Sequence, residues 1–167
     1  GIRGIGIGFG GPVDSAAGRT IVSHQVDGWE DFPLVAWCRE KFNLPAALGN
    51  DSDMAGLAEA RFGAGKGQRV VFYTNVGSGI GGALVIDGNV YPGSRGVASE
   101  LGHLRPGLEC LDPHETLESV SSGWGISNAV RRQLEVPGEA TPAQARDRED
   151  LLGRCGGSID RLTTKHI

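Results

Sequence analysis

Asn50 and Asp51 stand directly before a stretch with helical apolar spacing and are the first candidates for chemistry. Both residue types accept hydrogen bonds from the first turn of a helix, so the sequence predicts an N-cap here. A carboxylate at this place is also held ionised, because the helix dipole puts partial positive charge at the N-terminus. An ionised and positioned aspartate can act as a general base. Asp51 is therefore compatible with both a capping role and a catalytic one.

Glu100 and His103 stand three residues apart in the stretch SELGH. If this stretch forms one helical turn, the two side chains face the same way. Such a pair could bind sugar hydroxyls, ligate a metal ion or make a buried hydrogen bond, and taken alone the buried hydrogen bond is the default interpretation. Glu118, in TLESVSSG, is by itself an ordinary helix residue.

A run of glycines interrupts the strand-like stretch YTNVGSGIGGALVIDG (73–88), at Gly77, Gly79, Gly81 and Gly82. Because glycine weakens a strand, the pattern indicates either a tightly turned hairpin or close approach of another group to the backbone. Glycines let backbone N–H groups converge on a phosphate without a Cβ in the way, and Thr74 and Ser78 add hydroxyl groups. The spacing matches neither the P-loop nor the dinucleotide fingerprint, so both interpretations stay open at this point.

The elements that must position these residues alternate between strands and helices. Period-2 alternation predicts a strand at 5–9, which a GGPVD turn ends. A helix is predicted over 33–42, with one face formed by Leu34, Trp37, Cys38 and Phe42. The remaining patterns predict a strand near 46–48, a helix with Met54, Leu57, Ala58 and Phe62 at helical spacing, strands at 70–76 and 80–86, an Asp87-Gly88 turn into a third strand, mostly helices from about 114, and a loop at 137–142. Strands followed by helices are typical of an α/β chain.

Composition narrows the class of protein. The 167 residues are 39% hydrophobic and carry a formal net charge of -4, which suits a soluble globular protein of one domain or of parts of two. The absence of a basic stripe argues against nucleic acid as the main partner. The cysteines form no CxxC pair and predict reduced thiols in a cytoplasmic protein; they are Cys38, Cys110 and Cys155. No apolar run is long enough to span a membrane, and no signal peptide is recognised.

Three features lead us to expect a piece of a longer protein. The sequence begins at Gly1 within a predicted strand and ends at Ile167 within a helical pattern. Its only methionine is Met54. We therefore expect the natural start of translation to lie outside this sequence.

Several motifs taken together resemble one family. GIGIGFGGPVD, GW followed by PL, GND, FGAG, TNVGSGIGGALVIDGNVYPG, GVASELGH and LESVSSG occur in the order and rough spacing of the ROK family (repressor, open reading frame, kinase), from about residue 4 to 126. The resemblance implies an α/β chain of the actin-like ATPase (ribonuclease H-like) fold and an ATP-dependent sugar kinase similar to bacterial glucokinases. It also implies that residues 1–48 end the N-terminal domain of that fold, and that 49–167 form the first part of the C-terminal domain.

The resemblance further implies roles for the candidate residues. Asp51 looks like the catalytic base that takes the proton from a sugar hydroxyl. Sugar-binding positions of the family are matched by Asn50, Glu100, His103 and Glu118. Positions that contact the phosphates of ATP are matched by Gly77, Ser78, Gly79 and Gly81. Mg²⁺ would neutralise charge during phosphoryl transfer, which matters because a neutral hydroxyl is a poor nucleophile.

The sequence departs from the family pattern in three places. The first phosphate motif and the C-terminal adenosine-binding segments are absent, so ATP binding by these residues alone is not implied. The cysteine-rich zinc loop of many members is shorter here and keeps only Cys110. His103, Cys110 and His114 could form an atypical site, but structural zinc normally has four ligands, and no metal site is predicted. Gln25 stands where family kinases often have a sugar-contacting asparagine, so the sugar need not be glucose.

A sugar-sensing repressor is the alternative to the kinase, because family repressors keep the sugar pocket and add an N-terminal DNA-binding domain. Asp51 favours the kinase, since a sensor has less need of a base. A structural protein without catalytic activity is disfavoured, because the set of candidate catalytic and sugar-binding residues is intact. For the kinase we expect a sugar and ATP as small-molecule partners, and neither nucleic acid nor a membrane. The sugar and the oligomeric state, a homodimer included, stay open.

Overall fold

The computed structural model describes residues 1–23, 26–94, 98–135 and 141–167. Its contacts divide the chain into two compact units. The first unit consists of Gly1–Thr74 with Gly82–Ser99, and the second of Asn75–Gly81 with Glu100–Ile167. The glycine-rich turn thus belongs to the second unit, while most of the hairpin that carries it belongs to the first. None of the described helices is both long and apolar enough to cross a membrane.

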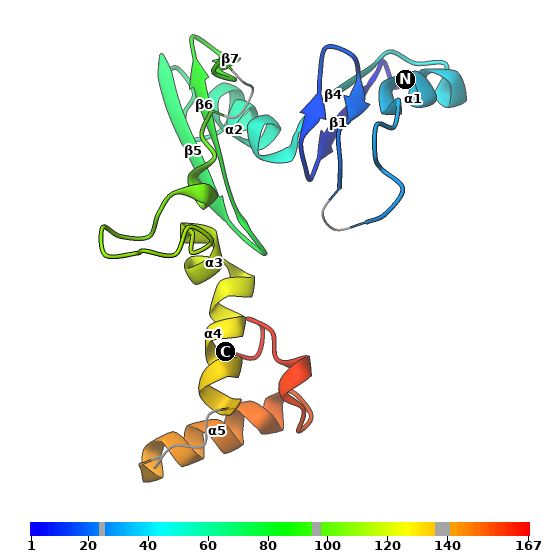
Figure 1. The fold of residues 1–167 in the computed structure, drawn as a ribbon. Helices are drawn as coiled ribbons and strands as arrows, with labels where there is room; N and C mark the ends of the chain where they lie inside the picture. The colour runs from blue at the N-terminus through cyan, green and yellow to red at the C-terminus, as the bar shows by residue number, and fades with distance from the viewer. Residues whose placement is uncertain (24–25, 95–97, 136–140) are drawn as a thin grey trace. The chain divides into compact units, whose positions relative to one another are not determined.

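The first unit contains a parallel pair of strands, β1 (Ile5–Phe9) and β4 (Ala46–Asn50), which lie side by side in Figure 1. Parallel strands need a crossover connection, and α1 (Leu34–Phe42) lies in it. The core between helix and strands buries Leu34, Val35, Cys38, Ala46 and Leu48. The register places Phe9 opposite Asn50, so both strands end at the same edge of the sheet. The segments that leave the two strands are therefore brought together at this edge.

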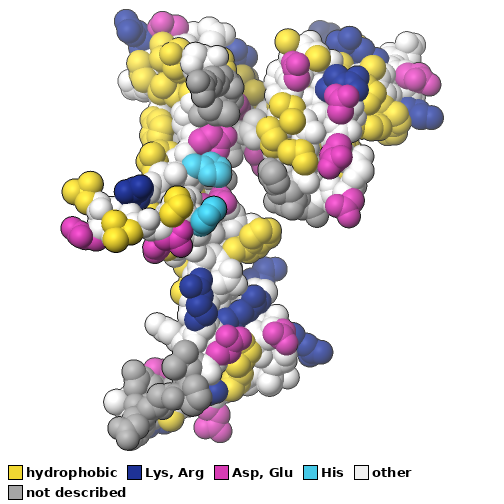
Figure 2. Space-filling view, in the orientation of Figure 1, with side chains coloured by type: hydrophobic (Ala, Val, Ile, Leu, Met, Phe, Trp, Pro, Cys, Tyr) yellow, Lys and Arg dark blue, Asp and Glu magenta, His cyan; other side chains and the backbone are white. Residues whose placement is uncertain are grey.

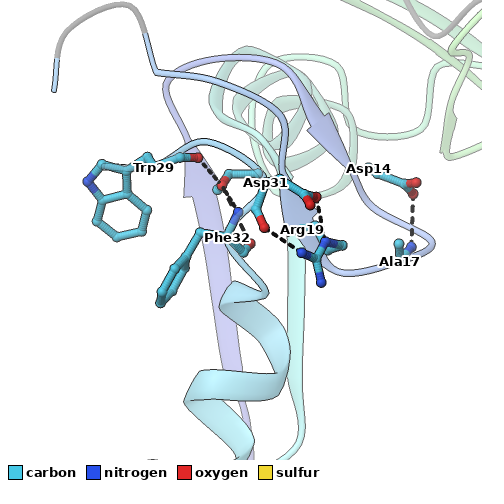
Figure 3. Close-up of polar contacts among 7 residues, drawn as sticks. Asp14, Ala17, Arg19, Trp29, Asp31 and Phe32 are labelled. Carbon is cyan, nitrogen blue, oxygen red and sulfur yellow. Dashed lines mark hydrogen bonds and ion pairs between the residues drawn. The ribbon is translucent and has the colours of Figure 1, made fainter. Parts of the chain in front are cut away.

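Polar contacts stabilise the part of the crossover that lies between β1 and α1. It begins with a short antiparallel hairpin, β2 (Val13–Asp14) and β3 (Arg19–Thr20). The fully buried Thr20 hydroxyl donates to the Trp29 carbonyl and accepts from the Phe32 N–H. Arg19 pairs with Asp31, with 2.6 Å between Nε and Oδ1 (Figure 3). These contacts fasten the two ends of the segment 19–32 to each other.

The buried face of α1 differs from the predicted one. Leu34 and Cys38 are buried as expected, but Trp37 and Phe42 are 42% and 56% exposed. These two rings instead continue an aromatic row, with centroids 6.0 Å apart and with Phe32 6.4 Å from Trp37. The helix packs its Leu34 and Cys38 side on the sheet, and the large rings stay at the margin.

A second sheet lies against α2 (Asp51–Phe62), the helix that comes directly after β4. Its strand order is β5 (Val70–Val76), β6 (Ile80–Ile86) and β7 (Asn89–Val90). The predicted Asp87-Gly88 turn is confirmed, because both residues have the positive φ (50° and 76°) that a tight hairpin turn requires. The strands and the turn therefore agree with the local sequence pattern.

The face of α2 that meets this sheet is formed by small residues. A Cβ built at Gly56 would lie 2.5 Å from the Cβ of Ala83, so helix and strand are in very close contact. Gly56 and Ala60 are buried, whereas Ala58 is exposed and Phe62 is 83% exposed. The apolar spacing in the sequence therefore marked the helix but not its buried face.

The second unit is mostly helical, as the sequence predicts. Its elements are η1 (Leu101–His103), α3 (Leu117–Ser121), α4 (Gly123–Glu135), α5 (Pro142–Arg154) and η2 (Ile159–Arg161). Its core contains Leu134, Cys155 and Leu162. Of the loop expected at 137–142, residues 137–140 lie outside the described part of the chain. Hydrophobic side chains also reach the surface (Figure 2, yellow), and in the loop after η1 Leu108 and Leu111 are 95% and 89% exposed.

Candidate active site

Asn50 forms the N-cap predicted for α2. Its Oδ1 accepts hydrogen bonds from the backbone N–H groups of Ser52 and Asp53, at 2.9 and 3.2 Å. Its Nδ2 donates to the carbonyl of Gly11, at 3.2 Å. Asn50 therefore joins the start of α2 to the segment after β1.

Asp51 is the exposed first residue of α2, and it lies over the end of β1. Its Oδ1 accepts a hydrogen bond from the Ser52 N–H at 2.8 Å. A Cβ at Gly10 would lie 3.5 Å from its Oδ2, and one at Gly8 would lie 3.4 Å from its Cα. These two glycines let the start of the helix approach the strand. The result is an accessible carboxylate held at a helix N-terminus, which is a suitable place for a general base.

Glu100 directly precedes one turn of 3-10 helix, η1, and His103 is the last residue of that turn, as the stretch SELGH predicts. Glu100 precedes the turn, and its carbonyl accepts from the N–H of His103 at 3.2 Å. Residues three apart in this type of helix are eclipsed, so the two residues share a face. Both residues are exposed. The default interpretation of a buried hydrogen bond between them is therefore wrong.

Glu118 is brought to the glycine-rich turn by α3. The helix begins with a capping box, in which Thr116 and Ser119 each bond the backbone N–H of the other. The Oε2 atom of Glu118 accepts the N–H of Ile80 at 2.7 Å. A residue that is ordinary in the sequence thus contacts the segment that the family resemblance assigns to phosphate.

The glycine-rich turn is also held by the start of α4. The N–H groups of Gly123 and Trp124 donate to the carbonyls of Gly77 and Ser78, at 2.8 and 3.3 Å. The Gly77 N–H in turn donates to the carbonyl of Gly79, at 2.8 Å. The turn is therefore a defined structure of the second unit, with its carbonyls fixed by a helix.

The glycines of this turn have different surroundings. A Cβ at Gly77 would meet nothing within 4 Å. One at Gly79 would lie 2.5 Å from Oε2 of Glu118. Gly81 lies within β6. The sequence left open why glycines are gathered in this turn. Gly79 makes room for a protein side chain, whereas Gly77 borders open space.

A pocket of about 590 Å³ lies beside the turn, within the second unit. Its lining comprises Ser78, Gly123, Trp124, Ser127, Asn128, Arg131, Leu162, Thr163, Thr164 and Lys165. The Nε atom of Arg131 is buried without a hydrogen-bond partner in the described part of the chain. Sequence reasoning missed Arg131 and Lys165, because the turn, α4 and the last segment are far apart in the chain and share no local motif.

No three His, Cys, Asp or Glu side chains are grouped to hold a metal ion among the described residues. His103, Cys110 and His114 therefore form no such cluster. The Cys110 thiol instead lies 3.4 Å from Oε2 of Glu115. Burial and the hydrogen bond to Glu115 raise the pKa of this thiol. Gln25, considered as a sugar contact, lies outside the described residues.

The structure thus brings the candidates together as two sets. In the first unit, Asn50 and Asp51 lie at the end of β1 and β4. In the second unit, Glu118 contacts the glycine-rich turn. Because η1 also contacts Glu118 through Gly102, Glu100 and His103 belong to this second set.

Known proteins are similar to this chain in fold and in sequence. A ROK family glucokinase from Streptomyces griseus, solved in complex with glucose and AMPPNP, matches with a TM-score of 0.78 and 29% identity over 99% of this chain and 52% of that chain. The glucokinase of Halalkalibacterium halodurans is 33% identical over 154 residues, which is 89% of this chain and 47% of the relative. The xylose repressor of Caldicellulosiruptor bescii is 34% identical over 103 residues, or 62% of this chain and 26% of the relative.

These likenesses confirm the α/β chain that the sequence pattern predicts and the actin-like ATPase fold that the family resemblance implies. The chain spans about half the length of the curated glucokinase that it matches. The sequence model of the ROK family matches residues 1–150. The chain therefore belongs to the ROK family.

Proposed function

We propose that the protein containing this chain transfers phosphate from ATP to a hexose, with Asp51 as the general base. The observation that carries the proposal is the Asp51 carboxylate, exposed at the N-terminus of α2 with one oxygen held by the Ser52 N–H. The likeness to glucokinases over most of the chain supports it. We also propose that residues 1–48 and 49–167 belong to the two domains of the actin-like fold.

Each candidate residue has a task in this proposal. ATP with Mg²⁺ would supply the phosphoryl group and neutralise its charge. Asp51 takes the proton of the reacting hydroxyl, and Asn50, which also caps α2, hydrogen-bonds the sugar beside it. Glu100, His103 and Glu118 bind other hydroxyls of the sugar. Gly77, Ser78, Gly79 and Gly81 contact the phosphates of ATP. The open space beside Gly77 fits a phosphate, since no side chain of the described residues would meet a Cβ there.

Exchange of Asp51 for asparagine tests the base. The amide keeps the shape of the side chain but cannot accept the proton, so Asp51→Asn should lower kcat at least about 100-fold and leave the sugar affinity within a few-fold. Asp53→Asn is the matched control, because it removes a carboxylate from the same first turn of α2 without touching the proposed base. Turnover by the full-length protein is measured with a panel of hexoses, ATP and Mg²⁺. Parent-like turnover of Asp51→Asn would show that Asp51 is not the base.

A sugar-sensing repressor is the second candidate, favoured by the likeness to a xylose repressor. In that case the sugar shifts a conformational equilibrium and is not consumed. The full-length protein would then bind a sugar without phosphorylating it, and the sugar would change its affinity for operator DNA. Measuring ATP consumption and DNA binding on the same preparation separates the two functions.

A further inference from the structure

We infer that Glu118 is a positioning residue that links the sugar site to the glycine-rich turn, so that hexose and ATP bind with positive cooperativity. The inference rests on the proposed kinase function and deepens it. It assigns to Glu118, beyond a contact with the sugar, the task of holding the backbone that meets the nucleotide.

The first observation is the hydrogen bond between Glu118 and Ile80. Oε2 accepts the Ile80 N–H at 2.7 Å, and Glu118 is half-buried at this contact. A hydrogen bond to a charged acceptor is stronger than one between neutral groups. Within the part of the chain that the structure describes, Oε1 of Glu118 accepts no hydrogen bond. One carboxylate oxygen, Oε2, therefore holds the turn, and the other, Oε1, is available for a sugar hydroxyl.

The second observation is that the protein is shaped around this carboxylate. A Cβ at Gly79 would lie 2.5 Å from Oε2, and one at Gly102 would lie 3.2 Å from the same atom. Gly79 belongs to the glycine-rich turn, and Gly102 is the middle residue of η1. The Oε2 atom therefore lies where the turn and the segment with Glu100 and His103 meet, and the two glycines give it room.

The third observation is that the turn has two supports. The start of α4 holds the carbonyls of Gly77 and Ser78 through the N–H groups of Gly123 and Trp124. Glu118 holds the N–H of Ile80 on the other side of the turn. The carbonyl of the same peptide, that of Gly79, accepts from the Gly77 N–H, and its N–H side is held by Glu118. The orientation of this peptide therefore depends on the Glu118 carboxylate together with the Gly77 N–H.

Cooperativity results from these contacts. A hexose hydroxyl bound to Oε1 restrains the carboxylate, and the restrained Oε2 restrains the turn on which the ATP phosphates are placed. A ligand that finds the turn already ordered binds more tightly, and by thermodynamic linkage ATP strengthens hexose binding by the same factor. Coupling between sites typically amounts to about 5-fold to 150-fold in affinity.

The test is the affinity of the full-length protein for a non-hydrolysable ATP analogue, measured by calorimetry with and without a hexose that the parent binds. We expect the hexose, at concentrations that saturate the parent and the variant alike, to tighten analogue binding at least about 5-fold in the parent and not at all in Glu118→Ala. Amide hydrogen exchange of Ile80 is the second readout, which needs no ligand. Protection of this amide should be lost in Glu118→Ala and kept in Glu118→Gln, whose side-chain oxygen can still accept the bond.

Gly79→Ala supplies an independent variant that keeps Glu118. Its Cβ would displace the carboxylate, so it should remove the cooperativity as well. If Gly79 acts through Glu118, combining both changes should weaken analogue binding no further than Glu118→Ala alone. An additive loss would instead assign Gly79 to direct contact with the nucleotide.

The outcomes separate this inference from the function on which it rests. A parent that binds hexose and analogue without cooperativity overturns the inference and leaves the kinase proposal intact. Unchanged Ile80 protection in Glu118→Ala also overturns it, because the hydrogen bond would then not hold the turn. A parent that binds neither ligand overturns the kinase proposal, and the inference falls with it.

Discussion

Gly56→Ala probes the contact that holds α2, and with it Asp51, against the second sheet. A Cβ at this position would lie 2.5 Å from the Cβ of Ala83 and 3.1 Å from the Cβ of Tyr73. Carbon atoms in normal contact are about 3.5–4.0 Å apart, so helix and strand must separate by about 1 Å. Ala83 is fully buried, and a Cβ is fixed to the backbone, so no flexible side chain can move out of the way.

Two opposing effects determine the size of the change. Alanine in place of glycine inside a helix adds about 1 kcal/mol to the free energy of unfolding. Overpacking of a tight contact typically removes about 1–3 kcal/mol, and the upper half of this range applies because both obstacles are Cβ atoms on strands. We therefore expect Gly56→Ala to lose about 1–2 kcal/mol in net stability.

Urea unfolding followed by circular dichroism measures this loss. Ala58→Gly is the matched control, since it exchanges the same two residue types at an exposed position of the same helix. It should lose about 1 kcal/mol through helix propensity alone. If Gly56→Ala is instead more stable than the parent by about 1 kcal/mol, helix propensity alone explains the change. The close contact between α2 and Ala83 would then be refuted.

Two further predictions concern ionisable groups. Burial and, after it, the hydrogen bond to Glu115 raise the pKa of the Cys110 thiol, so Glu115→Gln should speed the alkylation of Cys110 by iodoacetamide at pH 8. Mass spectrometry measures the alkylation rate, and equal rates in parent and variant would show that Glu115 does not raise this pKa. The hydrogen bond from Arg19 and, after it, the charge of Arg19 lower the pKa of Asp31. The ionised Asp31 therefore stabilises the folded protein above the ordinary aspartate pKa of about 3.9, and this stabilisation is lost as pH falls through the lowered pKa. Asp31→Asn, which tolerates the φ of 46° at this position, should therefore be less stable than the parent at pH 7, and the difference in urea midpoint should shrink below about pH 4; a constant difference contradicts this.

Local features of the structure could be predicted from the sequence. Asn50 caps α2 through the N–H groups of the next residues, and the Asp87-Gly88 turn forms within its own few residues. Both depend on short-range hydrogen bonds and on backbone preferences that a residue type carries with it. The one-turn helix at SELGH belongs to the same class, although it is a 3-10 turn.

Side-chain surroundings could not be predicted in the same way. Trp37 and Phe42 share the predicted apolar face of α1, yet both are exposed in the structure. In α2 the close contact is made by Gly56, which no hydrophobic pattern marks. Which face of a helix is buried depends on the partner it meets, and that partner is distant in the chain.

By itself, the sequence determined strands β1, β4, β5 and β6, the N-cap of α2, the Asp87-Gly88 turn and the ordered motifs shared with the ROK family, since these depend on neighbouring residues and on motif order. It did not predict the short strands β2 and β3. Only the tertiary structure decided what the glycines do. It shows that Gly79 and Gly102 make room for the carboxylate of Glu118, while Gly77 borders open space. The physical reason is that a missing Cβ matters only where another segment approaches, and that approach is set by packing between segments that are far apart in the chain.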